Sequence, residues 1–99
     1  MEEQLWVAAE NGNNDEIISL FDRGVNINAP NKSDDGWCAL HYASHEGLDT
    51  TVELLLRKCN ANVNILTSNG RTSLHIACNR LNRKVIERLL LAGANANIQ

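Results

Sequence analysis

Leu40-His41-Tyr42-Ala43-Ser44-His45-Glu46-Gly47 is a stretch that this 99-residue chain carries in three versions. The other two are Leu5-Trp6-Val7-Ala8-Ala9-Glu10-Asn11-Gly12 and Leu74-His75-Ile76-Ala77-Cys78-Asn79-Arg80-Leu81, so the copies begin 35 and 34 residues apart. A period of this length is typical of a solenoid built from stacked units. Because a solenoid offers an extended contact surface rather than one deep cleft, the period favours a binding function.

A second helical pattern follows each copy, with apolar residues at positions i, i+3 and i+4. These residues are Ile17, Leu20 and Phe21, then Val52, Leu55 and Leu56, then Ile86, Leu89 and Leu90. The spacing predicts a one-sided amphipathic helix of about ten residues, which needs neighbours to be stable. We expect these helices to end at Gly24, Asn60 and Gly93, where a positive φ angle is tolerated.

A short asparagine-rich segment recurs at the end of each unit, at residues 25–28, 61–64 and 94–97. The polar stretches that follow the first two asparagine-rich segments are rich in turn residues, which predicts projecting loops that resemble hairpins. The amides of Asn28, Asn64 and Asn97 are expected to bind loop backbone groups. Three units of helix, turn, helix and loop make the chain one domain, 1–99, with repeats at about 1–32, 33–66 and 67–99.

Two segments carry the signature of a known family. Gly36-Trp37-Cys38-Ala39-Leu40-His41-Tyr42-Ala43 and Gly70-Arg71-Thr72-Ser73-Leu74-His75-Ile76-Ala77 resemble the ankyrin repeat's Gly-x-Thr-Pro-Leu-His-x-Ala. Residues 89–97 resemble its Leu-Leu-x-x-Gly-Ala-Asp-x-Asn. Neither copy keeps the proline, and the first repeat lacks this start and resembles a capping repeat. The resemblance implies an all-α solenoid of three helix-turn-helix units joined by projecting loops like β-hairpins.

The resemblance also assigns structural roles to repeated residues. His41 and His75 match the family's histidine, which implies a hydrogen-bonding strut between a helix start and a loop. Cys78 occupies the same column as Ala9 and Ser44, where a column is a set of equivalent positions in the three copies. We therefore predict that Cys78 is a small buried apolar residue.

Catalytic and metal-binding patterns are weak. His41 and His45 have the spacing of zinc ligands on a helix, with Cys38 or Glu46 as a third ligand, but His41 already has a structural role. The cysteine–histidine pairs lack an oxyanion loop and an orienting group. The six glycines lie at turns rather than in a phosphate-binding loop. We predict that the chain is not an enzyme and holds no cofactor or metal.

Composition and charge limit the partners and the setting. No apolar run reaches the length of a membrane span, and a net charge of −3 disfavours nucleic acid. Three cysteines without disulfide or metal spacing predict a reducing setting, cytoplasmic or nuclear. Residues 1–48 carry nine acidic and two basic side chains, whereas residues 49–99 carry three acidic and seven basic ones. This gradient favours a partner protein with a basic segment opposite the first two repeats.

The variable columns indicate where a partner would bind, because ankyrin-like binders use loop tips and first-helix ends. Carried onto this chain, the positions are Glu10, Asn11, Asp34, Asp35, Trp37, His45, Glu46, Leu66, Ser68, Asn69, Arg71, Asn79 and Arg80. Trp37 stands out, since tryptophan is enriched at interface hot spots. Two interpretations of Trp37 are open: it contacts a partner, or it folds back over Pro30 and the first loop.

Two hypotheses for the function follow. The leading one is a non-enzymatic protein–protein interaction module that binds a partner through the concave face around Trp37. The alternative is a fragment or terminal segment of a longer ankyrin array, with a structural or scaffolding role and no dedicated ligand. In that case the uncapped C-terminal end at Ile98-Gln99 predicts weak self-association by end stacking in place of a monomer.

Overall fold

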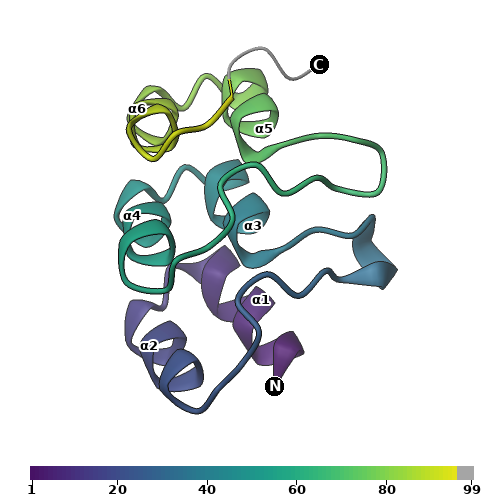
Figure 1. The fold of residues 1–99 in the computed structure, drawn as a ribbon, viewed down its shortest axis with the longest axis vertical. Helices are drawn as coiled ribbons and strands as arrows, with labels where there is room; N and C mark the ends of the chain where they lie inside the picture. The colour runs from purple at the N-terminus through teal and green to yellow at the C-terminus, as the bar shows by residue number, and fades with distance from the viewer. Residues whose placement is uncertain (96–99) are drawn as a thin grey trace.

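Three helix pairs stack on one another in the computed structural model, which describes residues 1–95. The pairs are α1 (Glu2–Asn11) with α2 (Asn14–Asp22), α3 (Ala39–His45) with α4 (Asp49–Arg57), and α5 (Ser73–Arg80) with α6 (Arg83–Leu91). Figure 1 shows α2, α4 and α6 in one layer, α1, α3 and α5 in the next, and the two long loops projecting on the far side. The all-α repeat solenoid predicted from the sequence is confirmed.

The leucine columns explain why these short helices are stable. Leu20, Leu55 and Leu89 of the second helices have no exposed surface, and Leu5, Leu40 and Leu74 of the first helices are also buried. Within the layers, α1 packs on α3, α3 on α5 and α4 on α6. The repeated alanines, Ala8, Ala43 and Ala77, are buried between the helices, where larger side chains would overpack the core.

The two long loops resemble hairpins only in part. The first contains a short 3₁₀ helix, η1 (Lys32–Asp34), and one isolated bridge between Asn31 and Trp37. The second is closed by the Thr67 amide, which donates to the Arg71 carbonyl at 2.8 Å. Within residues 1–95 neither loop forms a regular strand, because pairing stops after a single contact.

The second helices end as predicted, and the side chains of two asparagines in the asparagine-rich segments bind backbone groups as predicted. Gly24, Asn60 and Gly93 have φ angles of 91°, 58° and 92°, so each second helix ends in the left-handed conformation. The Asn28 side chain accepts the amide of Asn62, and that of Asn64 accepts the amide of Asn95, both at 2.9 Å. These bonds join each loop to the next repeat. The third predicted residue, Asn97, lies outside the described residues.

The prediction for Cys78 is wrong. Ala9 and Ser44, in the same column, have no exposed surface, whereas Cys78 is exposed. Because α3 covers α1 and α5 covers α3, this column is buried in the first two repeats. No helix of residues 1–95 covers the far side of α5 (Figure 1).

Among these residues, every helix also falls short of the length and apolar character needed to cross a bilayer.

Candidate functional site

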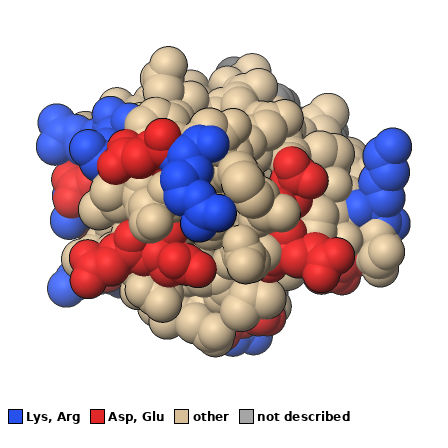
Figure 2. Space-filling view, turned by 90° about the horizontal axis from the view of Figure 1, so that it is seen from below, with Lys and Arg blue, Asp and Glu red and all other residues tan. Residues whose placement is uncertain are grey.

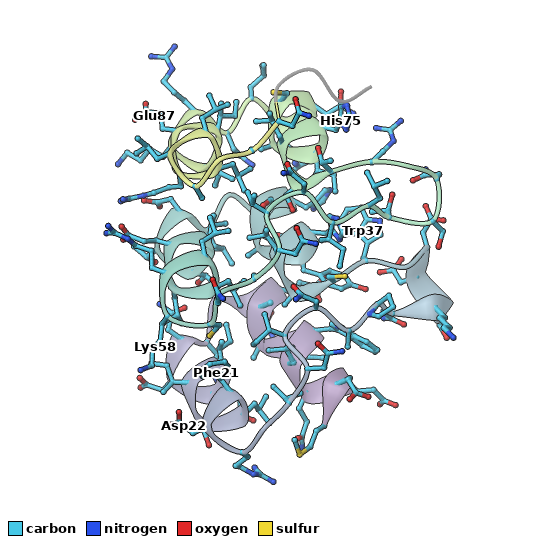
Figure 3. All side chains as sticks on the ribbon, viewed as in Figure 1. Phe21, Asp22, Trp37, Lys58, His75 and Glu87 are labelled. Carbon is cyan, nitrogen blue, oxygen red and sulfur yellow. The ribbon has the colours of Figure 1, made fainter. Side chains whose placement is uncertain are left out.

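Trp37 lies two residues before the start of α3, and its ring rests on side chains of that helix. The ring centroid is 5.4 Å from that of Tyr42, 5.5 Å from His45 and 6.1 Å from His41. The Trp37 carbonyl accepts the Asn31 amide at 2.9 Å, which fixes the backbone at the loop base. The ring is partly buried and sits between the two projecting loops (Figure 3). Pro30, over which the alternative interpretation places the ring, lines a hollow with Trp6 that Trp37 does not line.

A hollow of about 260 Å³, the Trp37 hollow, opens beside this ring. Two stretches of the sequence, 35–45 and 69–80, supply its lining: Asp35, Trp37, His45, Asn69, Arg71, Ile76, Asn79 and Arg80. All but Ile76 belong to the positions predicted from the variable columns. Ile76 is buried and shares a column with Val7 and Tyr42, so its pattern gave only a packing signal.

The chemistry of the Trp37 hollow is an apolar floor with a polar rim. Trp37 and Ile76 supply apolar surface, while the amides of Asn69 and Asn79 and the guanidinium of Arg71 supply hydrogen-bonding groups. Arg80 is held in place because its Nε donates to the His45 carbonyl at 3.2 Å. Such a mixture is typical of surfaces that receive protein side chains.

Close contact between the two loops positions the rim. The Ser68 amide donates to the Asp35 carbonyl at 2.8 Å. A Cβ atom at Gly36 would stand only 2.6 Å from the Ser68 hydroxyl, and the φ angle there is 70°, so the contact requires glycine. Thr67 then closes the second loop by bonding Asn69 at 2.5 Å and accepting the Arg71 amide at 3.1 Å.

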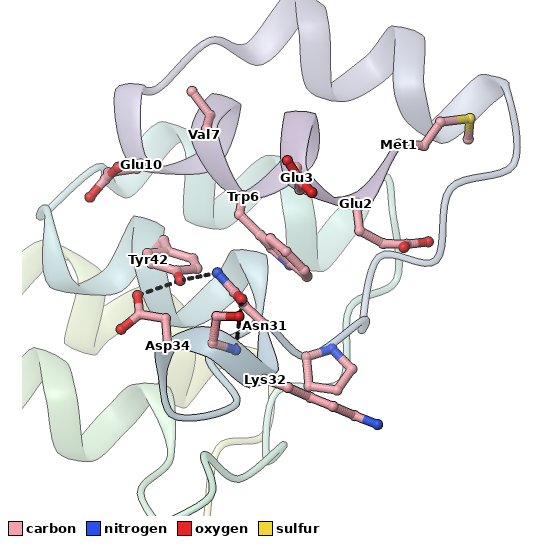
Figure 4. Close-up of a pocket in the computed structure, with 12 residues that line it drawn as sticks. Met1, Glu2, Glu3, Trp6, Val7, Glu10, Asn31, Lys32, Asp34 and Tyr42 are labelled. Atoms are coloured by element: carbon pink, nitrogen blue, oxygen red, sulfur yellow. Dashed lines mark hydrogen bonds between the residues drawn. The ribbon is translucent and has the colours of Figure 1, made fainter.

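A larger hollow of about 730 Å³, the Trp6 hollow, lies between α1 and the first loop (Figure 4). The Trp6 indole N–H donates to the Ala29 carbonyl at 3.0 Å. The Tyr42 hydroxyl donates to Asp34 at 2.5 Å and accepts from the Asn31 amide at 3.1 Å.

The sequence singled out only part of the Trp6 hollow. Glu10 and Asp34 were predicted site residues and line it, but Trp6, Asn31 and Tyr42 were not predicted. The sequence did hold a signal for Trp6, because Trp6 occupies the same column as His41 and His75. Its bond to Ala29 matches the 3.0 Å contact of His41 Nε2 with the Ile65 carbonyl, so tryptophan replaces the histidine strut in repeat 1.

The predicted histidine strut is confirmed at His41, where the two ring nitrogens bond the start of α3 and the second loop. His41 Nδ1 accepts the Cys38 amide at 2.8 Å, so Nε2 carries the hydrogen that is donated to Ile65. His75 Nδ1 likewise accepts the Thr72 amide at 3.0 Å. Burial lowers the pKa of His41, opposed in part by the bond to Ile65. Both ring nitrogens of His41 are engaged, which leaves neither for a metal.

Other titratable groups are shifted toward their neutral forms. Burial raises the pKa of the Cys38 thiol to about 11, so it is a poor nucleophile at neutral pH. The pKa of Tyr42 rises to about 12, first through burial, then through its bond to Asp34 and the nearby charges of Asp34 and Glu10. Within residues 1–95, no three His, Cys, Asp or Glu side chains gather in a way that could hold a metal ion.

The remaining predicted residues line neither hollow. Glu46 bonds His45 at 2.9 Å on the exposed surface, and Ser68 is used in the contact between the loops. Asn11 is exposed at the end of α1, and Leu66 is 51% exposed in the second loop. Figure 2 views the N-terminal end of the stack, where acidic side chains form several separate groups with basic ones between them. On this end of the stack the acidic side chains therefore do not form one continuous patch.

Comparison with known proteins identifies the family. A family model for ankyrin repeats matches three copies over residues 5–99. Mouse Rabankyrin-5 is 30% identical over 93 residues, covering 84% of this chain and 8% of that protein. Human ankyrin repeat domain-containing protein 40 is 33% identical over 85 residues, covering 86% of this chain and 23% of that protein. The chain therefore spans only a small part of these relatives, and it belongs to the ankyrin-repeat family.

Proposed function

We propose that this chain is a non-enzymatic interaction domain that holds a partner protein at the Trp37 hollow, on the side of the loops and first helices. Ankyrin repeats generally serve as protein–protein interaction modules. The observation that carries the proposal is the meeting, in one hollow, of seven residues from columns in which the copies differ from one another. Repeated residues explain the fold, so these non-repeated ones are available for recognition.

The partner's charge follows from the surroundings of the hollow. Glu10, Asp34 and Glu46 lie toward the first two repeats, whereas Arg71 and Arg80 lie at the far rim. A partner with a basic segment opposite the first two repeats would be attracted and oriented by this field. Because such attraction is screened, its binding should weaken as salt is raised.

The test is to change the rim without disturbing the core. Trp37 packs against the core, so Trp37→Ala confounds binding with folding. Arg71 and Asn79 are exposed, and the double variant Arg71→Ala with Asn79→Ala should fold normally while losing partners captured from a cell extract. Lys58→Ala is the matched control, because Lys58 lies on the outer layer, far from Trp37 (Figure 3). Capture of the same proteins by the double variant and by the control would contradict the proposal.

A second candidate function is a segment of a longer ankyrin array that has no dedicated ligand. Two observations favour it: the chain spans 8% and 23% of its relatives, and the third repeat leaves a stacking column exposed at Cys78. In this interpretation the exposed face of α5 stacks on another repeat.

Sedimentation velocity under reducing conditions tests the array interpretation. Self-association that depends on protein and salt concentration, and that Cys78→Arg abolishes, would support end stacking. A monomer at high concentration, insensitive to salt, would contradict it.

A further inference from the structure

We propose that the Trp6 hollow is a second subsite, which takes the guanidinium of an arginine in the partner's basic segment. This inference rests on the proposed function and names the chemistry of a site beside it. The hollow lies in the size range of pockets that bind ligands, at about 730 Å³. The first helix forms one wall and the first loop the other (Figure 4).

The aromatic part of the hollow is rigid before any ligand arrives. Trp6 uses its only polar hydrogen on the Ala29 carbonyl, so what remains toward the hollow is the ring itself. Tyr42 is fixed by two hydrogen bonds, one to Asp34 and one from Asn31. A planar cation that stacks on a ring held in this way loses little ordering entropy, and tryptophan is the best cation–π partner among the side chains.

The charge of the lining selects a cation. Four carboxylates line the hollow, from Glu2, Glu3, Glu10 and Asp34, against the single cationic side chain of Lys32. Among the described residues, no hydrogen bond or ion pair occupies the carboxylate of Glu10. Asp34 accepts the Tyr42 hydroxyl on one oxygen, which leaves the other oxygen for a ligand.

The position of Glu10 locates the cation within the hollow. Glu10 is in the last turn of α1, which has no basic residue there, and the carbonyl end of a helix favours positive charge. Burial and the bond to Asp34 raise the pKa of Tyr42 first, and the negative charges of Asp34 and Glu10 raise it further. The cation therefore belongs at the end formed by Glu10, Asp34 and Tyr42, away from the first turn of the helix.

Arginine fits this place better than lysine does. A guanidinium is planar, so it can stack on an aromatic ring while it donates two parallel hydrogen bonds to a carboxylate, and it is less strongly hydrated than an ammonium. The neighbouring Trp37 hollow differs in charge, because Arg71 and Arg80 line it with Asp35 as the single carboxylate. The two hollows together would bind a segment in one direction, with its arginine toward α1.

The two tryptophans of the chain allow each hollow to be observed separately. Trp6 lines one hollow and Trp37 the other, so the protein gives one indole N–H signal for each in a two-dimensional ¹⁵N NMR spectrum. Trp6→Phe and Trp37→Phe assign the signals. The probe is a peptide selected on the folded protein from a random displayed library at low ionic strength.

We expect the selected peptides to be enriched in arginine and to shift both indole signals. Replacing that arginine with neutral citrulline should remove the Trp6 shift and keep the Trp37 shift. Glu10→Gln combined with Asp34→Asn should weaken binding about tenfold or more, as loss of a charged hydrogen bond predicts. Asp22→Asn removes an acidic side chain on α2, away from both hollows, and should change binding less than about twofold.

The outcomes separate the two proposals. Peptides that shift only the Trp37 signal, or that bind the Glu10 and Asp34 variant as tightly as the Asp22 control, overturn the arginine subsite and leave the proposed function standing. Peptides that shift only the Trp6 signal overturn the Trp37 hollow as the main site and support the subsite. If no peptide is enriched, both proposals are wrong. Thermal melts by circular dichroism verify that each variant is folded.

Discussion

The middle and the last repeats share a sequence pattern but not an environment. Ser44 and Val52 in the middle repeat have no exposed surface, whereas Cys78 is exposed and Ile86 is partly exposed at the equivalent positions. The middle repeat has described neighbours on both sides, and the last has one on one side only. In a stack of this kind, burial belongs to the position of a repeat as much as to its residues.

The largest expected effect is the loss of a leucine from the fully buried column. Leu55→Ala in the middle repeat should lower the free energy of unfolding by about 2–5 kcal/mol, because it leaves a cavity. Leu89→Ala removes the same side chain from the last repeat and should cost less, since only one interface depends on it. Urea denaturation followed by circular dichroism measures both.

Leu91→Ala is the matched control for these two variants. Leu91 is 84% exposed, so the same chemical change should alter stability by less than about 0.5 kcal/mol. A larger loss for Leu89→Ala than for Leu55→Ala would contradict the idea that neighbours on both sides stabilise the middle repeat.

Burial of His41 in the middle repeat should make the protein sensitive to acid. Its pKa is lowered in the folded state, so protons bind more readily to the unfolded chain. The stability due to neutral His41 is complete above its ordinary pKa of 6.5 and is lost as the pH falls below that value. For one proton the slope can reach at most about 1.4 kcal/mol per pH unit.

Urea denaturation between about pH 7.5 and about pH 5 measures the slope. His41→Gln should be less stable than the original protein at the upper pH, because a hydrogen-bonding strut is lost, and its stability should fall less on acidification. If both proteins lose stability at the same rate, His41 is not the responsible group.

A smaller effect on stability is expected at the column that holds glycine in the first two repeats and leucine in the last. Opposite substitutions in the two repeats should there change stability in opposite directions. Gly12 and Gly47 have φ angles of 72° and 74°, and Leu81 in the last repeat has 57°, a conformation that costs a leucine about 1 kcal/mol. Leu81→Gly should therefore stabilise the protein by about 0.5–1 kcal/mol, since the side chain is 85% exposed and contributes little packing.

The reverse change at Gly47 should be destabilising by about 1 kcal/mol or more. A Cβ atom there would stand 3.0 Å from the Asn82 side-chain oxygen and would disturb the Asn82 bond to the Ser44 carbonyl, which joins the two repeats. Thermal melts of Leu81→Gly and Gly47→Ala compare the two repeats directly. A less stable Leu81→Gly protein would show that its backbone is not under strain.

The features that were predictable from the sequence are those that recur in each copy. The leucine column, the positive φ at Asn60 and the asparagine bonds at residues 28 and 64 follow from local chemistry repeated with a fixed period. Cys78 was mispredicted because its burial depends on a neighbouring helix, which no residue of the column itself encodes. Trp6 was missed because its role as a strut appears only when its indole reaches Ala29.

The candidate site was predictable in part for the same reason. Variable columns led to seven residues that line the Trp37 hollow. The position of Ser68 depends on how the second loop rests on Asp35 and Gly36, and the sequence does not fix that contact in advance. Tyr42 was passed over because it lies inside the repeated stretch, yet its hydroxyl organises the Trp6 hollow.

The smallest expected effect concerns the ionic contact between the middle and last repeats. Arg88 on α6 reaches across to α4, at 2.8 Å from Glu53 and 3.8 Å from Asp49. Arg57 meets the same Glu53 from within α4, at 3.3 Å, with its side chain 80% exposed.

Arg88→Gln should cost about 0.5–1 kcal/mol and Arg57→Gln less than about 0.5 kcal/mol, because exposed pairs are well screened. Urea denaturation at low and high salt measures both, and the difference should shrink with salt. Equal losses for the two variants would mean that the contact across the repeats adds nothing to the attachment of the last repeat, which would then depend on apolar packing alone.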